Sequence, residues 1–569
     1  MKSFLKSFIA SCLGTLVAIG LIIFIGFIIV SSYTKQAKNN QSGILHIPFS
    51  GTIADYESNR LDLASFNFGS SGLTLWELRK KINSAAKDPN IKAIFLELKT
   101  VQMSQQMISE LSVLLQNFKK EGKKIFAYSD YYEQNAYLLS TFADSIYLNP
   151  NGGVSLKGYA VFSPFFDSLL EKWDIDLHVY YAGKYKSSTE PYRLDSFSLD
   201  NQEQLRAYLS QLHSNLVTWV FQNRGIPETK VEKILNMYQD YNSEVMQANG
   251  IVDRIIYRDE VIDLLDREYD GEELVKFDQY KGSVPNTSKE VALVFAQGEI
   301  IWNNTGTGGI SHGEYSDIFK KIREDDEIKT VILRIDSPGG NGYTSDLLHR
   351  EVILLKEAGK KVLSSFGTYA TSGAYYMACA SDSIYATDNS MTGSIGVYIM
   401  LPTFEQFLAE HLEIGVDTIL GSENGLAYTP LVKLTDQQEK SFQAQTERLY
   451  DLFLEKVANG RDMNVEEVNE IAQGRIWNGQ DALKKNLIDE LLTLDELVNR
   501  FTQDKSPQVY PEQKLSLTQE LIENNLGKLA NADLYQIKWM NDKVLEFQKL
   551  MEKPAPLMRV PHFINVTNQ

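Results

Sequence analysis

The chain is poor in the residues on which several classes of site depend. Its 569 residues include only two cysteines, Cys12 and Cys379, which excludes a disulfide framework and a cysteine-based metal cluster. Basic residues are not in excess, because 56 Lys and Arg stand against 74 Asp and Glu, a formal net charge of −18. A broad nucleic-acid surface is therefore not expected, since a phosphate backbone attracts a surplus of positive charge.

Long apolar runs are absent except for one near the N-terminus. Residues 8–30 carry no charge, and as a helix they would span about 35 Å, enough to cross a hydrocarbon core of about 30 Å. A cleavable signal peptide has a shorter apolar core, although Val30-Ser31-Ser32 could serve as a cleavage site. We interpret residues 1–40 as an uncleaved, single-pass signal anchor that precedes a soluble body.

The rest of the sequence contains an internal repeat with a spacing of about 237 residues, far too long for a solenoid unit. The matching segments are Ile91–Leu98 with Ile328–Ile335, Gly122–Ile125 with Gly359–Val362, and Asn249–Asp253 with Lys485–Asp489. We predict two tandem domains, residues 41–287 and 288–500, divided at the polar stretch 281–289. A C-terminal tail, residues 501–569, follows them, with helices expected around 515–529 and 533–551.

Each copy alternates short apolar runs with helical patterns. In the second copy we expect strands at 291–295, 330–335, 361–365 and 383–385. We expect helices there at 346–358 and 436–459. The helix at 202–224 is the counterpart of the last one. Strands that alternate with crossover helices predict an α/β fold with a largely parallel sheet in each copy.

Three segments of the second copy could carry chemistry. The glycine pair in Asp336–Gly340 would let a backbone N–H approach a ligand closely, but an ordinary strand-to-helix turn has the same sequence. Ser372, within Tyr369–Tyr376, follows a strand and enters a helix, so it suits a nucleophile and an N-cap equally well. The segment Met391–Val397 is typical of a tight turn.

A serine nucleophile needs a base, and histidine is a poor candidate in this sequence. The seven histidines are scattered, and none lies between His349 and His411. A Ser-His-Asp triad is therefore weakly supported, and a lysine base is the alternative.

The two copies differ in the residues that such a site would use. At the positions of Ser372 and Gly373 the first copy has about Gln134 and Asn135, so it cannot supply the nucleophile. It does contain the lysine-bearing stretch 183–192, whereas the corresponding part of the second copy, near 421–426, has no lysine. A site shared between the copies would explain this division, as would independent losses after duplication.

In combination these residues resemble signal peptide peptidase A, the long, duplicated form of a membrane-anchored bacterial Ser/Lys protease family. The resemblance runs from the anchor through both repeats to the segment Gly474–Ala482. It implies two crotonase/Clp-protease-like domains, a homotetramer, and a place in the bacterial cytoplasmic membrane with the catalytic body on the periplasmic side. It also implies cleavage of remnant signal peptides and other apolar peptides, without a metal or cofactor.

The resemblance also assigns the two central roles. Ser372 matches the family nucleophile, and Lys186 matches the general base of the Tyr-Lys-Ser motif, which its neighbour Lys184 does not. A free lysine has a pKa of about 10.4 and is protonated at neutral pH. Lys186 must therefore be buried, because burial in apolar surroundings lowers a lysine pKa.

The same resemblance implies three supporting roles. The amides of Gly340 and Gly373 would stabilise the oxyanion, and Ser394 would orient the lysine, with the Gly396 carbonyl nearby.

Two other functions are alternatives to a protease, because they share this fold or chain organisation. One is a crotonase-like acyl-CoA enzyme, and the other is a catalytically inert membrane scaffold.

Overall fold

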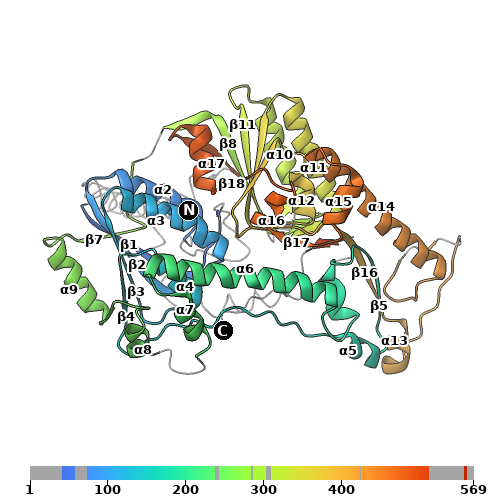
Figure 1. Ribbon diagram of the computed structural model, residues 1–569. Coiled ribbons are helices and arrows are strands. Elements are labelled where there is room, and N and C mark those ends of the chain that lie inside the picture. Colours follow the sequence, from blue (N-terminus) through green and yellow to red (C-terminus); the bar gives the residue numbers. More distant parts are fainter. Residues whose placement is uncertain are drawn as a thin grey trace, which may run out of the picture.

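The structure is a computed structural model that describes residues 42–57, 73–237, 242–283, 286–302, 309–422, 425–426, 428–511 and 557–559. The expected anchor at 8–30 and the tail helices expected at 515–529 and 533–551 lie outside these residues. A search of the described helices finds none that is both long and apolar enough to span a bilayer. Two α/β halves lie side by side, the first in blue and green and the second in yellow and orange (Figure 1).

The first half is built on a six-stranded parallel sheet of order β6-β4-β3-β2-β1-β7. Its strands are β1 (Gly43–Thr52), β2 (Ile91–Gln102), β3 (Lys124–Ser129), β4 (Ser145–Leu148), β6 (Arg254–Ile255) and β7 (Leu274–Lys276). Its helices are α2 (Leu75–Lys87), α3 (Gln105–Lys120), α4 (Gln134–Ser140), α6 (Leu199–Arg224), α7 (Glu228–Leu235), α8 (Ser243–Ala248) and α9 (Arg258–Glu268).

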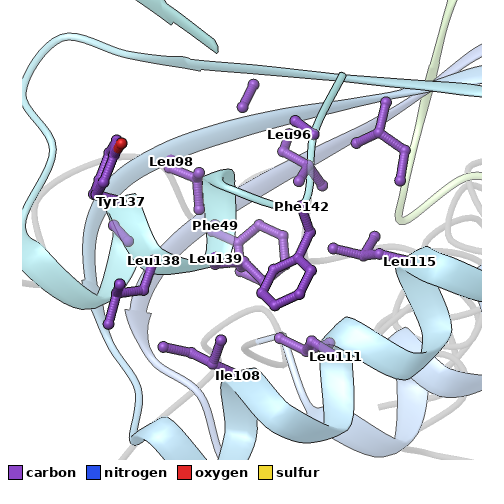
Figure 2. Close-up of a cluster of buried hydrophobic side chains, with 14 of the residues drawn as sticks. Phe49, Leu96, Leu98, Ile108, Leu111, Leu115, Tyr137, Leu138, Leu139 and Phe142 are labelled. Carbon is purple, nitrogen blue, oxygen red and sulfur yellow. The ribbon is translucent and has the colours of Figure 1, made fainter. Parts of the chain in front are cut away.

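The core of this half forms where strands meet helices. Figure 2 shows Phe49 and Leu96 from the sheet facing Ile108 and Leu111 of α3, with Phe142 closing the cluster. The central strand β2 is buried over most of its length, as expected for a parallel sheet with a helix on each face.

The second half has an eight-stranded sheet whose main path is β17-β15-β13-β11-β8-β19, with β14 paired to β13 and β18 paired to β14. Its strands are β8 (Thr287–Gln297), β11 (Thr330–Ser337), β13 (Lys361–Thr371), β14 (Ser383–Ala386), β15 (Met391–Gly393), β17 (Ile476–Asn478), β18 (Glu490–Leu491) and β19 (Ser506–Tyr510). Its helices are α10 (His312–Glu324), α11 (Gly342–Glu357), α12 (Gly373–Ala378), α14 (Asp436–Arg461), α15 (Val465–Ile471), α16 (Gly479–Lys484) and α17 (Leu494–Thr502).

The strands expected in this half are all present. The helix expected at 346–358 begins earlier, at Gly342, because the Asn341 side chain accepts the Thr344 N–H at 2.9 Å and caps it there. The helix expected at 202–224 also begins earlier, at Leu199, where Ser198 caps α6.

The same side-chain contacts occur in both halves. One buried tyrosine hydroxyl in each half donates to a backbone carbonyl, and one arginine in each half pairs with an aspartate. The pairs are Tyr137 with Ile251, Tyr375 with Leu487, Arg224 with Asp253 and Arg461 with Asp489. These contacts follow the sequence repeat and mark the halves as copies of one fold.

A third sheet, of order β10-β9-β12-β20-β16-β5, crosses between the halves. It consists of β5 (Asp176–Ala182), β9 (Ile300–Ile301), β10 (Ile310–Ser311), β12 (Gly339–Asn341), β16 (Val397–Thr403) and β20 (Leu557–Arg559). The short helices α5 (Asp167–Lys172) and α13 (Glu405–Leu412) lie at its outer end (Figure 1). β5 belongs to the first copy and β16 to the second. Their antiparallel pairing therefore places residues of the first copy against the second copy.

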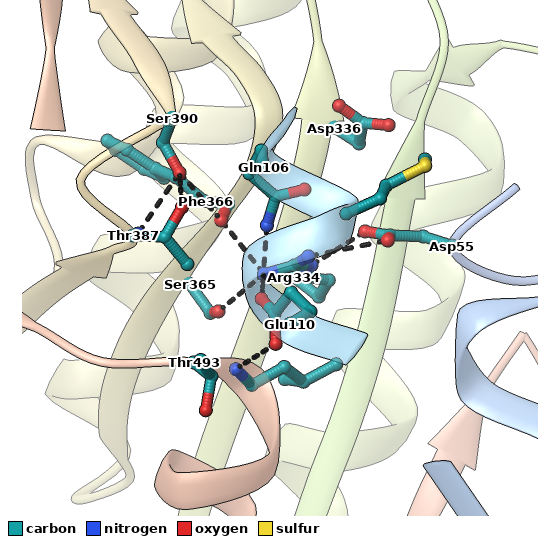
Figure 3. A network of polar contacts seen from close by, with 12 residues as sticks. Asp55, Gln106, Glu110, Arg334, Asp336, Ser365, Phe366, Thr387, Ser390 and Thr493 are labelled. Carbon is teal, nitrogen blue, oxygen red and sulfur yellow. Dashed lines mark hydrogen bonds and ion pairs between the residues drawn. The ribbon is translucent and has the colours of Figure 1, made fainter. Parts of the chain in front are cut away.

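A buried ionic network also joins the halves (Figure 3). Arg334 of β11 is fully buried, and its Nε donates to Asp55 Oδ2 at 2.6 Å. Its Nη1 lies 3.1 Å from Glu110 Oε1 on α3. Burial raises the pKa of Glu110 to about 7, against the opposing effect of the Arg334 charge. Buried charges of opposite sign tie the halves together, because neither can be exposed alone without leaving the other unpaired.

Candidate active site

Ser372 stands at the junction of β13 and α12 in an unusual backbone conformation. Its φ is 55° and its ψ is −120°, a region that non-glycine residues rarely adopt. It occupies the N-cap position of α12, yet its side chain makes no capping hydrogen bond. The hydroxyl is thus held by the backbone at a strained turn and remains available to another partner, in contrast to an ordinary capping serine.

The strand that delivers Ser372 is irregular just before it. The register between β11 and β13 shifts between Ile335 and Ser337, so Asp336 of β11 lies opposite residues 367–369 of β13. Asp336 Oδ1 accepts the Tyr369 N–H at 3.0 Å. Burial, reinforced by the Asp55 charge, raises the pKa of Asp336 to about 7. The Asp336 carboxyl group therefore fixes the backbone three residues ahead of Ser372.

Lys186 reaches Ser372 from the other copy of the repeat. After β5 pairs with β16, the chain turns at Gly183 and places Lys186 in the interior, with 1% of its surface exposed. Its Nζ lies 2.9 Å from Ser372 Oγ, 3.0 Å from Ser394 Oγ and 3.0 Å from the Ser394 carbonyl oxygen. The structure thus brings together three of the site residues expected from the sequence. The backbone carbonyl that accepts from the amine is that of Ser394 itself.

Burial sets the protonation of Lys186. It lowers the pKa of the amine from its ordinary value of 10.5 to about 7. Leu205 of α6 and Ile476 of β17 line a cavity of about 10 Å³ against the lysine, room for about one water molecule. A large part of the lysine is therefore neutral at pH 7, and a neutral amine can accept a proton from a hydroxyl.

Gly474 and Arg475 hold the lysine segment in place, a role for which their sequence gives no motif. Gly474 has a φ of 76°, and a Cβ on it would come within 2.6 Å of the Lys186 backbone nitrogen. Arg475 donates through Nη1 to the Tyr185 hydroxyl at 3.0 Å, and its carbonyl accepts the Ser394 N–H at 2.7 Å. The segment Gly474–Ala482 is part of the family resemblance, but nothing in the sequence indicates that it contacts residue 186.

Two glycine amides lie beside Ser372. A Cβ placed on Gly373 would collide with Ser345 Oγ and come within 3.4 Å of the Gly340 backbone nitrogen. Gly340 itself has a φ of 150°, and a Cβ there would collide with the Ile300 backbone. The Gly340 and Gly373 segments thus meet next to residue 372, in a space that admits only glycine at both positions.

Comparison with known proteins identifies the family. The model of peptidase family S49 matches the chain twice, at residues 117–270 and 354–507, which together make up more than half of the chain. The chain belongs to peptidase family S49. The two matches fall in the two copies of the repeat, so the S49 domain is duplicated.

Among curated relatives, Protease 4 of Haemophilus influenzae is 28% identical, over 96% of this chain and 93% of its own. The chloroplastic serine protease SPPA of Arabidopsis thaliana is 31% identical, over 82% of this chain and 70% of its own. Among solved structures, ClpP1 from Listeria monocytogenes is 13% identical over 35% of this chain and 91% of its own, with a TM-score of 0.23.

Family S49 membership makes this chain a serine protease, which replaces the acyl-CoA enzyme and inert scaffold as alternatives. The other candidates for its base lie elsewhere. His349 packs edge-on against the Tyr376 ring, and burial lowers its pKa to about 4. Lys184 is more than half exposed and lies 3.7 Å from Asp200. Neither residue has the buried contact with Ser372 that Lys186 makes.

The first copy uses its counterparts of Ser372 and Gly373 for structural hydrogen bonds. Gln134 Oε1 accepts the backbone N–H groups of Lys157 and Gly158, and Asn135 Nδ2 donates to the Met103 carbonyl. Asn135 also lines a cavity of about 790 Å³ between the halves. In this S49 chain, the first copy provides a lysine and the second provides a serine.

Proposed function

We propose that this S49 protease is a membrane-anchored signal peptide peptidase that works through a Ser372/Lys186 dyad. One observation carries the proposal: a fully buried lysine from one repeat lies 2.9 Å from a strained serine of the other. A serine hydroxyl with a neutral amine at hydrogen-bonding distance is the arrangement that Ser/Lys hydrolases use.

The proposed reaction uses residues of this chain only. Neutral Lys186 keeps two N–H groups for Ser394 and accepts the Ser372 proton with its lone pair. Ser372 Oγ then attacks the peptide carbonyl, and the Gly340 and Gly373 amides stabilise the oxyanion. The Lys186 ammonium returns its proton to the leaving amine. Water then hydrolyses the acyl-enzyme by the same route.

The substrate class rests on relatives and on the N-terminal segment. A relative from Enterococcus faecium, a putative signal peptide peptidase SppA, is 30% identical over 42% of this chain and 66% of its own. An anchor at residues 8–30 would hold the enzyme beside peptides that leave the bilayer, which raises their effective concentration. The substrates are therefore remnant signal peptides and other apolar peptides.

The organisation that we propose follows the family resemblance. The catalytic body consists of two crotonase/Clp-protease-like domains, residues 41–287 and 288–510, followed by the tail 511–569. The second domain extends beyond the limit of residue 500 expected from the sequence, because β19 (Ser506–Tyr510) pairs with β8 in its sheet. It forms a homotetramer on the periplasmic side of the bacterial cytoplasmic membrane. The chemistry described above requires no metal or cofactor.

The test is peptidase activity of the purified full-length chain on a fluorogenic apolar peptide. Ser372→Ala and Lys186→Ala should each lower kcat at least 1,000-fold, since each removes a member of a unit that acts together. Lys184→Ala is the matched control, because it removes the neighbouring, exposed lysine and should leave kcat within about twofold. Full activity of Lys186→Ala, in a protein that is folded by circular dichroism, would contradict the dyad.

A further inference from the structure

One side chain of α6 connects the two residues beside Lys186 to the second copy. Gln204 is 4% exposed, and its Nε2 donates to the Tyr185 carbonyl oxygen at 3.0 Å and to Ser187 Oγ at 3.2 Å. Its Oε1 accepts the backbone N–H of Ile476, in β17, at 3.2 Å. A single amide group thus holds the lysine segment from both sides and joins it to a strand of the other copy.

Both polar atoms of the Gln204 side chain are used, and the pattern requires an amide. Nε2 also lies 3.1 Å from a third acceptor, Asn201 Oδ1. A carboxylate at this position could accept the Ile476 N–H but could not donate, and an apolar side chain could do neither. Either replacement would take a hydrogen bond away from the buried Tyr185 carbonyl oxygen, which is costly inside a protein.

Gln204 also lines the space beside the amine. Together with Leu205 it borders the cavity of about 10 Å³ against Lys186. Apart from the lysine itself, none of the described residues that line this cavity is charged. Burial is accordingly the cause of the lowered pKa of Lys186, with no contribution from a charged neighbour among the described residues.

The charged side chains around the lysine segment have other partners. They belong to the segment itself, to the 3₁₀-helix Ser187–Tyr192, to α6 and to the residue before β17. Their contacts are Lys184 with Asp200 at 3.7 Å, Arg475 with Glu203 at 2.8 Å, and Glu190 with Asn201 at 2.8 Å. Gln204 therefore occupies the point at which these elements meet without bringing a charge to the amine.

We propose that Gln204 is a positioning residue of the proteolytic reaction, whose amide holds the lysine segment against β17 and keeps the lining beside the amine neutral. The inference rests on the proposed function, because Gln204 acts through the proposed base, Lys186. Proton transfer requires Lys186 Nζ at hydrogen-bonding distance from Ser372 Oγ, and the amide secures the backbone on which that distance of 2.9 Å depends. A negative charge in its place would stabilise the ammonium and keep the base protonated at pH 7.

The first test is Gln204→Met in the full-length chain, which keeps the length of the side chain but removes its hydrogen bonds. On the fluorogenic apolar peptide, kcat should fall about tenfold or more, while KM stays within about twofold, because the residue does not contact the substrate. The low-pH fall in kcat/KM should stay centred near pH 7, since no charge is added. A kcat within twofold of wild type would overturn the positioning role.

The second test is Gln204→Glu, which keeps the size of the side chain and adds a negative charge beside the amine. The pKa of Lys186 should rise from about 7 by about one unit or more. Because only the neutral amine is active, activity is lost as pH falls through this higher pKa. The midpoint of the low-pH fall in kcat/KM should therefore move to about pH 8 or above.

Gln202→Glu is the matched control for the added charge. It places the same charge on the same helix, but the Gln202 amide donates to the Phe197 carbonyl and does not line the lysine cavity. Its pH profile should match that of wild type. A midpoint that stays in place in Gln204→Glu, or that moves equally in both variants, would overturn the neutral lining.

These measurements separate a positioning role from a purely structural one. Urea unfolding of each variant gives the folded fraction by which kcat is corrected, so a loss of folded protein is not counted as a loss of catalysis. If Gln204 only supports the fold, its variants lose stability but keep the wild-type kcat and pH profile, and that result overturns the proposal while the proposed function stands. A wild-type chain that cleaves no peptide contradicts the proposed function itself.

Discussion

The protonation of Lys186 offers the sharpest test of how burial produces activity. Leu205 of α6 lines the small cavity against the lysine and is itself 8% exposed. Leu205→Ala would open this cavity to water, which favours the charged amine and moves its pKa from about 7 back towards 10.5. Only the neutral amine accepts the serine proton. Activity is therefore lost as pH falls through the lysine pKa, and a higher pKa moves this loss to higher pH.

The magnitude follows from the titration. With a pKa of about 7, kcat/KM should reach a plateau above pH 8 and fall about tenfold for each unit below pH 7. If Leu205→Ala raises the pKa by about one unit, the neutral fraction at pH 7 falls from about one half to about one tenth. Activity at pH 7 then falls about fivefold and returns to the wild-type level near pH 10.

The assay is kcat/KM on a fluorogenic peptide from pH 5 to 10. Leu212→Ala is the matched control, since Leu212 is 6% exposed on the same helix but does not line the lysine cavity. Each substitution should lower the free energy of unfolding by about 2–5 kcal/mol. Only Leu205→Ala should move the low-pH fall in kcat/KM to higher pH. A wild-type profile that climbs without a plateau to pH 10, or equal shifts in both variants, would refute the reasoning.

Three further outcomes are expected. Gly373→Ala should lower kcat at least 100-fold with little change in KM, because the new methyl group collides with Ser345 beside the oxyanion site; unchanged kcat would contradict this placement. Arg334→Met should lower the free energy of unfolding by about 3–5 kcal/mol in urea titrations, because it leaves Asp55 buried and unpaired; a neutral effect would contradict a role in joining the halves. Asp336→Ala should lower kcat about tenfold, whereas Asp336→Asn keeps an acceptor and should retain most of the activity; equal losses would show that charge matters more than the hydrogen bond.

Much of the architecture could be predicted from the sequence because periodicity and repetition are local signals. The buried strands at 330–335 and 361–365 and the duplication itself are visible as apolar runs at a fixed offset. The helix starts were less certain, since caps such as Asn341 and Ser198 depend on one side-chain hydrogen bond each.

The site was harder to predict, because its parts are far apart in the chain. Ser372 could be singled out from its neighbours, but its contact with Lys186 joins residues 186 positions apart through the pairing of β5 with β16. The division of residues between the copies suggested a shared site, but only family resemblance singled out Lys186 as the partner of Ser372. The roles of Gly474 and Arg475 depend on close backbone approach to the lysine segment, and a single sequence holds no trace of such an approach.

The central claim is that one chain supplies both members of the dyad, each from a different repeat. Co-expression of Ser372→Ala with Lys186→Ala tests this most directly, with wild type co-expressed with the double variant as the control. Because both groups meet within one chain, mixed assemblies should show no activity above that of either variant alone, while the control should remain active. Recovery of a quarter or more of the control activity would show that serine and lysine come from different chains and would contradict the account.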